Sequence, residues 1–138
     1  MRKTAHLFAT VALTNADFTY WFADVFNGQT FWTFLKRLVA KYGGRKVFLV
    51  IDNAPCHNLP PDGKEWLAEN RHRIELHRLP PYSPELNAIE PVWKVTRKMT
   101  THNRFYATTD ERDAALRKTF AAFRRKPSLI SAHVERFQ

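Results

Sequence analysis

Residues 79–93 read LPPYSPELNAIEPVW, and this stretch joins the end of a predicted strand to the start of a predicted helix. A proline fixes its own φ and restricts the residue before it to extended geometry, so the proline-rich start of the stretch predicts a stiff turn. Ser83 with Pro84, or Asn87 with Glu90 three residues later, would then begin the helix. Either start places Glu90 in an early helical turn. Alone, an Asn-x-x-Glu pattern favours a simple capping box over a functional site, and the surrounding sequence changes that balance.

Two predicted strands lead towards this turn. Residues 47–51, VFLVI, form an apolar run typical of a strand that is buried on both faces, and the run ends at Asp52. Residues 74–79 predict the next strand, with a short helix over 64–70 between the two. Open α/β sheets bind their ligands at the carboxyl ends of strands. Asp52 and Glu90 are therefore expected to meet at one edge of a sheet.

The rest of the pattern completes a fold class. Residues 6–13 and 19–26 predict a β-hairpin, and an apolar stripe over 31–42 predicts a helix. This order of strands and helices predicts an α/β fold with a mixed sheet flanked by helices. A chain of 138 residues that is 44% hydrophobic has room for one core, so we expect a single domain over 1–138.

The charge of the chain predicts a polyanionic partner. Lys and Arg total 22 against 13 acidic residues, which gives a net charge of +9 and a pI of about 10.1. From Lys94 to Lys126 there are ten basic and three acidic residues, a net charge of +7. The predicted helices of about 86–138, one of them opened by the capping-box pair Thr108 and Glu111, would therefore carry the basic surface. The residues expected to contact the backbone of a polyanion such as nucleic acid are Lys94, Arg97, Lys98, Arg104, Arg117, Lys118, Arg124, Arg125 and Lys126.

Cysteine content and the paired acids limit the cofactors. The single Cys56 excludes an internal disulfide and a cysteine-rich zinc site, and it is compatible with a reducing cytoplasm. Two carboxylates that share a site repel each other unless a cation joins them. Because no Cys or His cluster is present, that cation would be Mg²⁺ or Mn²⁺. Two such ions are the usual means of activating phosphoryl transfer.

Two segments of the chain carry a resemblance to a known family, and these are VFLVIDNAPCH, residues 47–57, and LPPYSPELNAIEPVW, residues 79–93. Together they resemble the second and third catalytic blocks of mariner-type and bacterial insertion-sequence transposases, which are DDE superfamily endonucleases. The resemblance extends over about residues 7–98 and implies an RNase H-like fold. It implies that Asp52 and Glu90 are the catalytic and metal-binding acids, with two Mg²⁺ or Mn²⁺ ions in a complete site. Ala88 departs from the proline that is usual in the family. The site-lining residues implied by the resemblance are Asn53, His57, Tyr82, Ser83 and Asn87.

The first acid of the family has no match in this sequence. In the family it lies on a strand that precedes the hairpin, and neither Asp17 nor Asp24 matches it. That strand would lie at the centre of the sheet, between the hairpin and residues 47–51. The chain is thus expected to be the truncated carboxyl-terminal part of a transposase, and to be weak or inactive alone.

The resemblance implies DNA cleavage and strand transfer during transposition. DNA is the expected partner, in a bacterial cytoplasm and without a membrane partner. The upstream transposase fragment and a second copy of the chain, forming a homodimer, are further candidate partners. Two alternatives stay open: a non-catalytic DNA-binding or assembly remnant of a transposase, and an RNase H-like nuclease that cleaves without joining strands. A third carboxylate in the site would distinguish a catalytic domain from a remnant.

Overall fold

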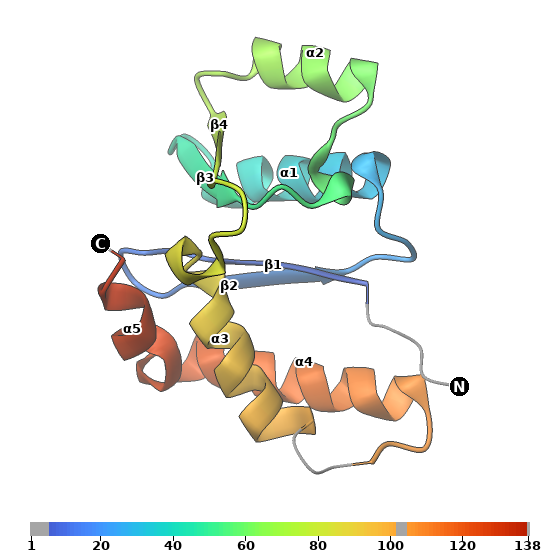
Figure 1. The fold of residues 1–138 in the computed structure, drawn as a ribbon, viewed down its shortest axis with the longest axis vertical. Coiled ribbons are helices and arrows are strands. Elements are labelled where there is room, and N and C mark those ends of the chain that lie inside the picture. Colours follow the sequence, from blue (N-terminus) through green and yellow to red (C-terminus); the bar gives the residue numbers. More distant parts are fainter. Residues whose placement is uncertain (1–5, 102–104, 138) are drawn as a thin grey trace. The chain divides into compact units, whose positions relative to one another are not determined.

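The computed structural model describes residues 6–101 and 105–137 (Figure 1). The chain divides into two compact units. The first combines the described residues up to Tyr20 with those from Ala88 onward, and the second is Trp21–Asn87. Both helices and strands occur, so the predicted α/β class is confirmed. Among the helices of these described ranges, none has the length and apolar character that a bilayer span requires.

A β-hairpin opens the first unit. Strand β1 (Leu7–Val11) pairs with strand β2 (Phe18–Phe22). Ala12 N donates to Asp17 O at 2.9 Å, and Asp17 N donates to Asn15 Oδ1 at 3.0 Å. A connection this short makes the strands antiparallel, and asparagine is well suited to such a turn. Both strands are shorter than predicted. The first ends at Val11 because Ala12 belongs to the hydrogen-bonded turn, and the second ends at Phe22, four residues before the predicted end.

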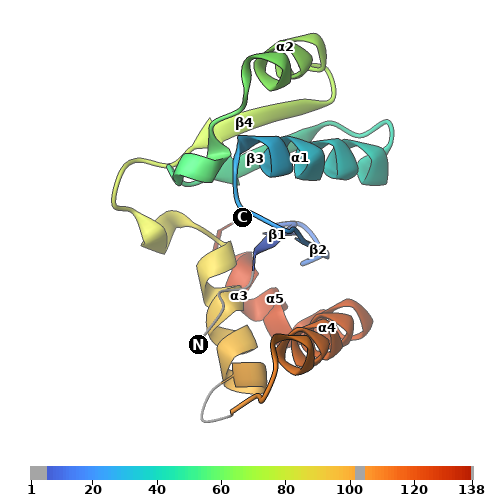
Figure 2. The ribbon, with the colours of Figure 1, turned by 90° about the vertical axis from the view of Figure 1, so that its right-hand side faces the viewer.

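Three helices pack on one side of this hairpin (Figures 1 and 2). They are α3 (Ile89–Thr96), α4 (Thr109–Arg125) and α5 (Ser128–Glu135). Helix α3 runs on into a π-helical turn over Arg97–Thr101. Such turns widen the helix locally and change which side chains face inward.

The start of α4 is set by local hydrogen bonds. The Thr108 hydroxyl accepts from Glu111 N at 3.1 Å, and the Glu111 carboxylate accepts from Ala107 N at 3.0 Å. A threonine in this position contributes about 1 kcal/mol to helix stability. The predicted start of this helix is confirmed, although the returning carboxylate reaches the residue before the cap.

Phe18 lies at the centre of the aromatic core of the first unit. It is 0% exposed, and its ring centroid lies 4.9 Å from that of Phe120 and 5.5 Å from that of Phe123, both on α4. Trp93 on α3 approaches the same ring edge-on at 6.3 Å. Burying one such side chain contributes about 1.5–3 kcal/mol. This core holds α3, the helix that carries Glu90, against the hairpin.

Helix α1 (Gly28–Tyr42) is the main helix of the second unit. It begins with a reciprocal capping box, in which Asn27 Oδ1 accepts from Thr30 N at 2.8 Å and Asn27 N donates to Thr30 Oγ1 at 3.1 Å. The predicted helix is confirmed. Its buried side chains are Phe31, Phe34, Leu35, Leu38 and Val39.

The second unit also contains a parallel strand pair. Strand β3 (Val47–Ile51) pairs with β4 (Ile74–Arg78), and Ile51 lies opposite Arg78. Helix α2 (Pro61–Glu69) makes the crossover between them. It begins three residues earlier than predicted, because proline is well tolerated at the first helical position. Asp52 and Leu79 consequently leave the pair at the same edge.

The burial of β3 differs from the prediction. Phe48 is 62% exposed and Val50 is 46% exposed, whereas Ile51 is 5% exposed. One face of the strand is therefore open in the second unit. A continuous apolar run shows that both faces of a strand are apolar. It does not show which other elements of the chain cover each face.

Gly28 provides a test of how tightly α1 packs. A Cβ atom at this position would lie 2.1 Å from the main-chain oxygen of Asn58. We expect Gly28→Ala to lower the free energy of unfolding by about 1–3 kcal/mol, because backbone must move to admit the methyl group. Gly44→Ala is the matched control, since a Cβ there meets nothing within 4 Å. Urea denaturation of both variants measures the difference, and equal effects would contradict this close approach.

Candidate active site

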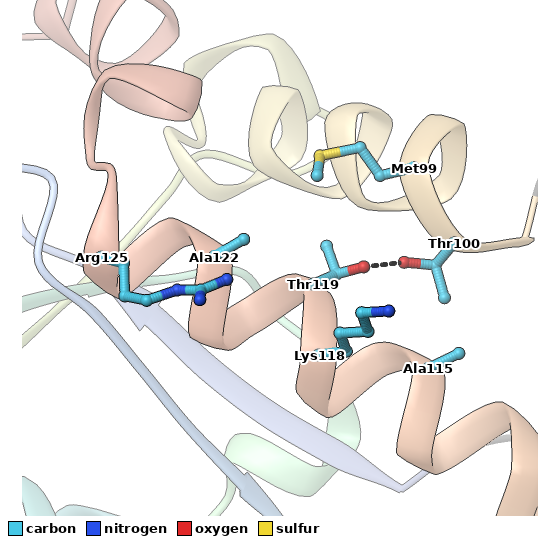
Figure 3. A pocket seen from close by; sticks show the side chains of 7 residues that line it. All are labelled: Met99, Thr100, Ala115, Lys118, Thr119, Ala122 and Arg125. Atoms are coloured by element: carbon cyan, nitrogen blue, oxygen red, sulfur yellow. Dashed lines mark hydrogen bonds between the residues drawn. The ribbon is translucent and has the colours of Figure 1, made fainter.

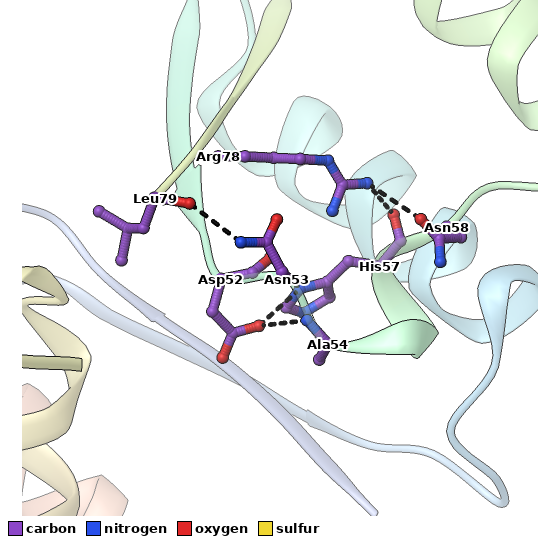
Figure 4. Close-up of polar contacts among 7 residues, drawn as sticks. All are labelled: Asp52, Asn53, Ala54, His57, Asn58, Arg78 and Leu79. Carbon is purple, nitrogen blue, oxygen red and sulfur yellow. Dashed lines mark hydrogen bonds and ion pairs between the residues drawn. The ribbon is translucent and has the colours of Figure 1, made fainter. Parts of the chain in front are cut away.

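Asp52 is the first residue after β3, and part of its carboxylate is held in place. Its Oδ1 accepts a hydrogen bond from Ala54 N at 2.9 Å (Figure 4). The side chain is 53% exposed. In the described part of the chain, no hydrogen bond or ion pair engages Oδ2. One oxygen is thus oriented by the protein, and the other is available to a ligand.

His57 holds the same residue from a short 3₁₀ turn over Pro55–His57. Its Nδ1 lies 3.0 Å from Asp52 Oδ1 and 3.1 Å from the main-chain oxygen of Asp52. Both oxygens accept hydrogen bonds, so Nδ1 carries the proton in this arrangement. The imidazole ring also packs against Phe31 of α1, with ring centroids 4.7 Å apart. His57 therefore orients Asp52 through Nδ1, and that nitrogen is not free to bind a metal.

Asn53 joins the ends of the two parallel strands. Its Nδ2 donates to the main-chain oxygen of Leu79 at 3.0 Å (Figure 4). This bond connects the residue after Asp52 to the residue after β4. The structure thus brings Asp52, Asn53 and His57 together at this edge.

Arg78 belongs to this cluster and was missed in the sequence. Its Nη2 donates to the main-chain oxygen of His57 at 3.0 Å and approaches Asn58 Oδ1 at 3.3 Å. It ties the 3₁₀ turn to the end of β4 (Figure 4). The sequence did contain a signal for Arg78, because it is the last residue of β4, which runs parallel to β3 and ends at the same edge as Ile51.

The segment from Pro80 to Asn87 leads away from β4. Tyr82 is 100% exposed and has a φ of 57°, a left-handed conformation that costs a non-glycine residue about 1–2 kcal/mol. Ser83 is half-buried, and its hydroxyl donates to Pro81 O at 3.2 Å. Asn87 is buried, at 9% exposure. Of the three site-lining residues predicted here, Tyr82 faces solvent, Ser83 is half-buried and Asn87 is buried.

Glu90 is the second residue of α3, and it belongs to the first unit. It lies in the first helical turn, as predicted, but neither predicted cap forms. Ala88 occupies the N-cap position, and no side-chain hydrogen bond caps the helix. The reason is that Asn87 N donates to Pro84 O at 3.0 Å and closes a separate 3₁₀ turn over Pro84–Leu86 before α3 begins. Within the described ranges, the Glu90 carboxylate makes no hydrogen bond or ion pair.

The donor chemistry of Asp52 fits a hard divalent cation. Carboxylate oxygens are the ligands that Mg²⁺ and Mn²⁺ prefer, and an outer-shell hydrogen bond such as that from His57 is typical support for a ligand. No group of three or more His, Cys, Asp or Glu side chains in residues 6–101 and 105–137 is arranged to hold a metal. Asp52 and Glu90 therefore remain predicted ligands, and Asp52 is the better defined of the two.

The predicted DNA-contacting residues lie on the first unit. Arg104 lies outside the described residues, and the others are all exposed: Lys94, Arg97, Lys98, Arg117, Lys118, Arg124, Arg125 and Lys126. Lys118 and Arg125, seven residues apart on α4, line a hollow of about 230 Å³ (Figure 3). Its other lining residues are Met99, Thr100, Ala115, Thr119 and Ala122. The cations of α4 therefore adjoin the π-helical turn that follows α3.

An α/β fold with an acid at the carboxyl end of a parallel strand is consistent with the RNase H-like class. A profile of the DDE superfamily endonuclease family matches residues 1–112, and the chain belongs to this family. A search of curated proteins found no match. Family membership indicates a transposase-type nuclease that acts on DNA, and members generally use divalent metal ions.

Cys56 reports on the charge of Asp52. Burial raises the pKa of the Cys56 thiol above its ordinary value, and the negative charge of Asp52 raises this pKa further. Asp52→Asn removes the charge and leaves the burial, so the pKa should fall part of the way back. Because the thiolate is the reactive form, alkylation by iodoacetamide at about pH 8 should become faster.

The rate of alkylation as a function of pH measures this shift, since Cys56 is the only cysteine in the chain. Glu75→Gln is the matched control, because Glu75 lies on β4 and pairs with Lys46 at 3.1 Å. An unchanged pH profile in Asp52→Asn would show that the carboxylate does not lie where this geometry places it.

Proposed function

We propose that the chain is the catalytic domain of a transposase, which cleaves DNA at element ends and joins the freed 3′ hydroxyl to target DNA. The observation that carries the proposal is the Asp52 carboxylate. It stands at the edge where β3 and β4 end, with one oxygen held by Ala54 and His57 and the other open. Membership of the DDE superfamily endonucleases supplies the class of substrate, DNA.

In this proposal Asp52 and Glu90 hold Mg²⁺ or Mn²⁺. Two bound ions would activate the attacking oxygen and stabilise the leaving oxygen of the phosphodiester. Asp52 contributes the carboxylate oxygen that the protein leaves open. His57 and Ala54 keep that carboxylate in one orientation, which lowers the entropy lost when a ligand binds.

A further strand would complete the site. Val47 N donates to Arg73 O at 2.8 Å, and Ile51 O accepts from Leu79 N at 2.8 Å. The backbone groups of Val47 and Ile51 therefore point to the edge of β3 that pairs with β4. Successive residues of a strand point their backbone groups to opposite edges, and Phe48 and Val50 therefore face the other edge. We propose that a strand carrying the first acid pairs there. The upstream transposase fragment or a second copy of the chain would supply it, and activity without it would be weak.

The exposed cations of the first unit would hold the DNA backbone. Phosphate contacts of this kind fix the position of DNA without reading its sequence. They leave the reacting phosphate free to be placed by the acids.

Asp52→Asn is expected to weaken Mn²⁺ binding by roughly 10-fold or more, because it replaces a carboxylate ligand by a neutral amide. Calorimetric titration with Mn²⁺ measures this, with Glu75→Gln as the control that keeps Asp52. Unchanged Mn²⁺ affinity would remove Asp52 from the metal site.

Glu90→Gln and Asp52→Asn should each abolish metal-dependent DNA cleavage in a version of the chain extended by the additional strand, while DNA binding is retained. Gel assays of nicking, strand joining and mobility shift separate the outcomes. Binding without cleavage by the extended parent protein would favour the non-catalytic remnant, and cleavage without joining would favour an RNase H-like nuclease. Cleavage by either variant would contradict the assigned role of that acid.

Neutralising Arg97, Lys98, Arg124 and Arg125 to Gln should weaken DNA binding equally for unrelated sequences. Each lost phosphate contact lowers the slope of log K against log salt by about 0.9, so the full variant should lose up to about 4. Fluorescence anisotropy over a range of salt concentrations measures the slope. Lys36→Gln with Lys64→Gln, two exposed cations of the second unit, is the control. Equal slopes in the two variants would show that the basic face of the first unit is ordinary solvated surface.

A further inference from the structure

Tyr82 is an aromatic side chain that the fold leaves fully in solvent. It is 100% exposed, whereas the other three tyrosines of the chain, Tyr20, Tyr42 and Tyr106, are half-buried. Its backbone also has the left-handed φ of 57°. Neither core packing nor a favoured backbone conformation accounts for a large aromatic residue at this position.

The segment that carries Tyr82 is stiff. Prolines fix φ at Pro80, Pro81 and Pro84 around it. The Ser83 hydroxyl donates to Pro81 O at 3.2 Å, and Leu86 N donates to Ser83 O at 3.1 Å. A ring held on such a segment has few conformations to lose on binding, because tyrosine itself has only two side-chain torsions.

The same segment is anchored beside the candidate metal ligand. Asn53, the neighbour of Asp52, donates from Nδ2 to Leu79 O at 3.0 Å. Three residues of chain lead from Leu79 to Tyr82, and they span at most about 11 Å. Successive nucleotides of one strand of B-form DNA lie about 3.4 Å apart along the helix axis. A phosphate bound at Asp52 and a base at Tyr82 would therefore be separated by only a few nucleotides.

We infer that Tyr82 stacks on an unpaired nucleobase of the DNA substrate, a few nucleotides from the phosphate that Asp52 positions. The inference rests on the proposed function, because it takes DNA as the ligand of this site. An aromatic ring can stack on any base, since every base has a π face. Bases inside a duplex already stack on both neighbours, so the ligand is a base that is frayed, overhanging or turned out of the helix. Tyr82 thus selects DNA with an opened end, with little preference for sequence.

The test uses the full chain and three variants. Tyr82→Ala removes the ring, Tyr82→Phe keeps a ring that can stack, and Phe105→Ala removes another exposed aromatic side chain, 92% exposed, from the first unit. The ligands are a blunt duplex and the same duplex with a short single-stranded overhang, with affinities measured by fluorescence anisotropy. Circular dichroism confirms that each variant is folded.

We expect Tyr82→Ala to bind the overhang duplex roughly 5-fold to 150-fold more weakly, the range for losing one stacked base. Tyr82→Phe and Phe105→Ala should stay within about 2-fold of the parent chain, and all four proteins should bind the blunt duplex alike. The slope of log K against log salt should be unchanged in Tyr82→Ala, because a neutral side chain releases no counterions. 2-Aminopurine placed at successive overhang positions should show one position whose emission differs between the parent chain and Tyr82→Ala.

Several results would overturn the inference. Equal overhang binding by the parent chain and Tyr82→Ala would show that the ring does not contact DNA, and it would leave the proposed function standing. Equal losses in Tyr82→Ala and Phe105→Ala would indicate a general effect of removing apolar surface. A change of sedimentation coefficient in Tyr82→Ala would indicate that the ring packs against another protein chain. If the parent chain bound neither DNA, both the inference and the proposed function would fail.

Discussion

The parallel pairing of β3 with β4 is the constraint on which the candidate site depends. Parallel strands end at the same edge of a sheet, and the register that places Ile51 opposite Arg78 brings Asp52 beside Leu79. Asn53 reaches Leu79, and Arg78 reaches back to His57, only because of this register. A slip of one residue would turn these side chains to the opposite face and separate them.

Hydrogen bonds across this edge orient Asp52 more than they stabilise the fold. A single such bond contributes about 1 kcal/mol net, a small part of the stability of a domain. Their effect is geometric, because His57 and Ala54 hold one carboxylate oxygen from two directions while Arg78 holds the turn that carries His57. These side chains are thereby held in one arrangement by the protein itself.

In the first unit, the same packing that forms the core also exposes the cations. The Phe18 ring lies against Phe120 and Phe123, which directs one face of α4 towards the hairpin. The opposite face must then meet solvent, and it carries Lys118 and Arg125. The positively charged face of α4 is thus a consequence of how the aromatic residues are spaced along this helix.

Sequence by itself determined the elements whose causes are local. It located β3 to the residue, because a short apolar run bounded by polar residues is a property of the segment alone. It located the start of α4 through Thr108, and it placed Asp52 directly after β3. Only the tertiary structure decided that one face of β3, with Phe48, is open, and that Arg78 supports the site. Such features depend on residues that are distant in the sequence, as with Arg78 and His57, which are 21 residues apart. A local sequence pattern does not show which distant residue will be in contact.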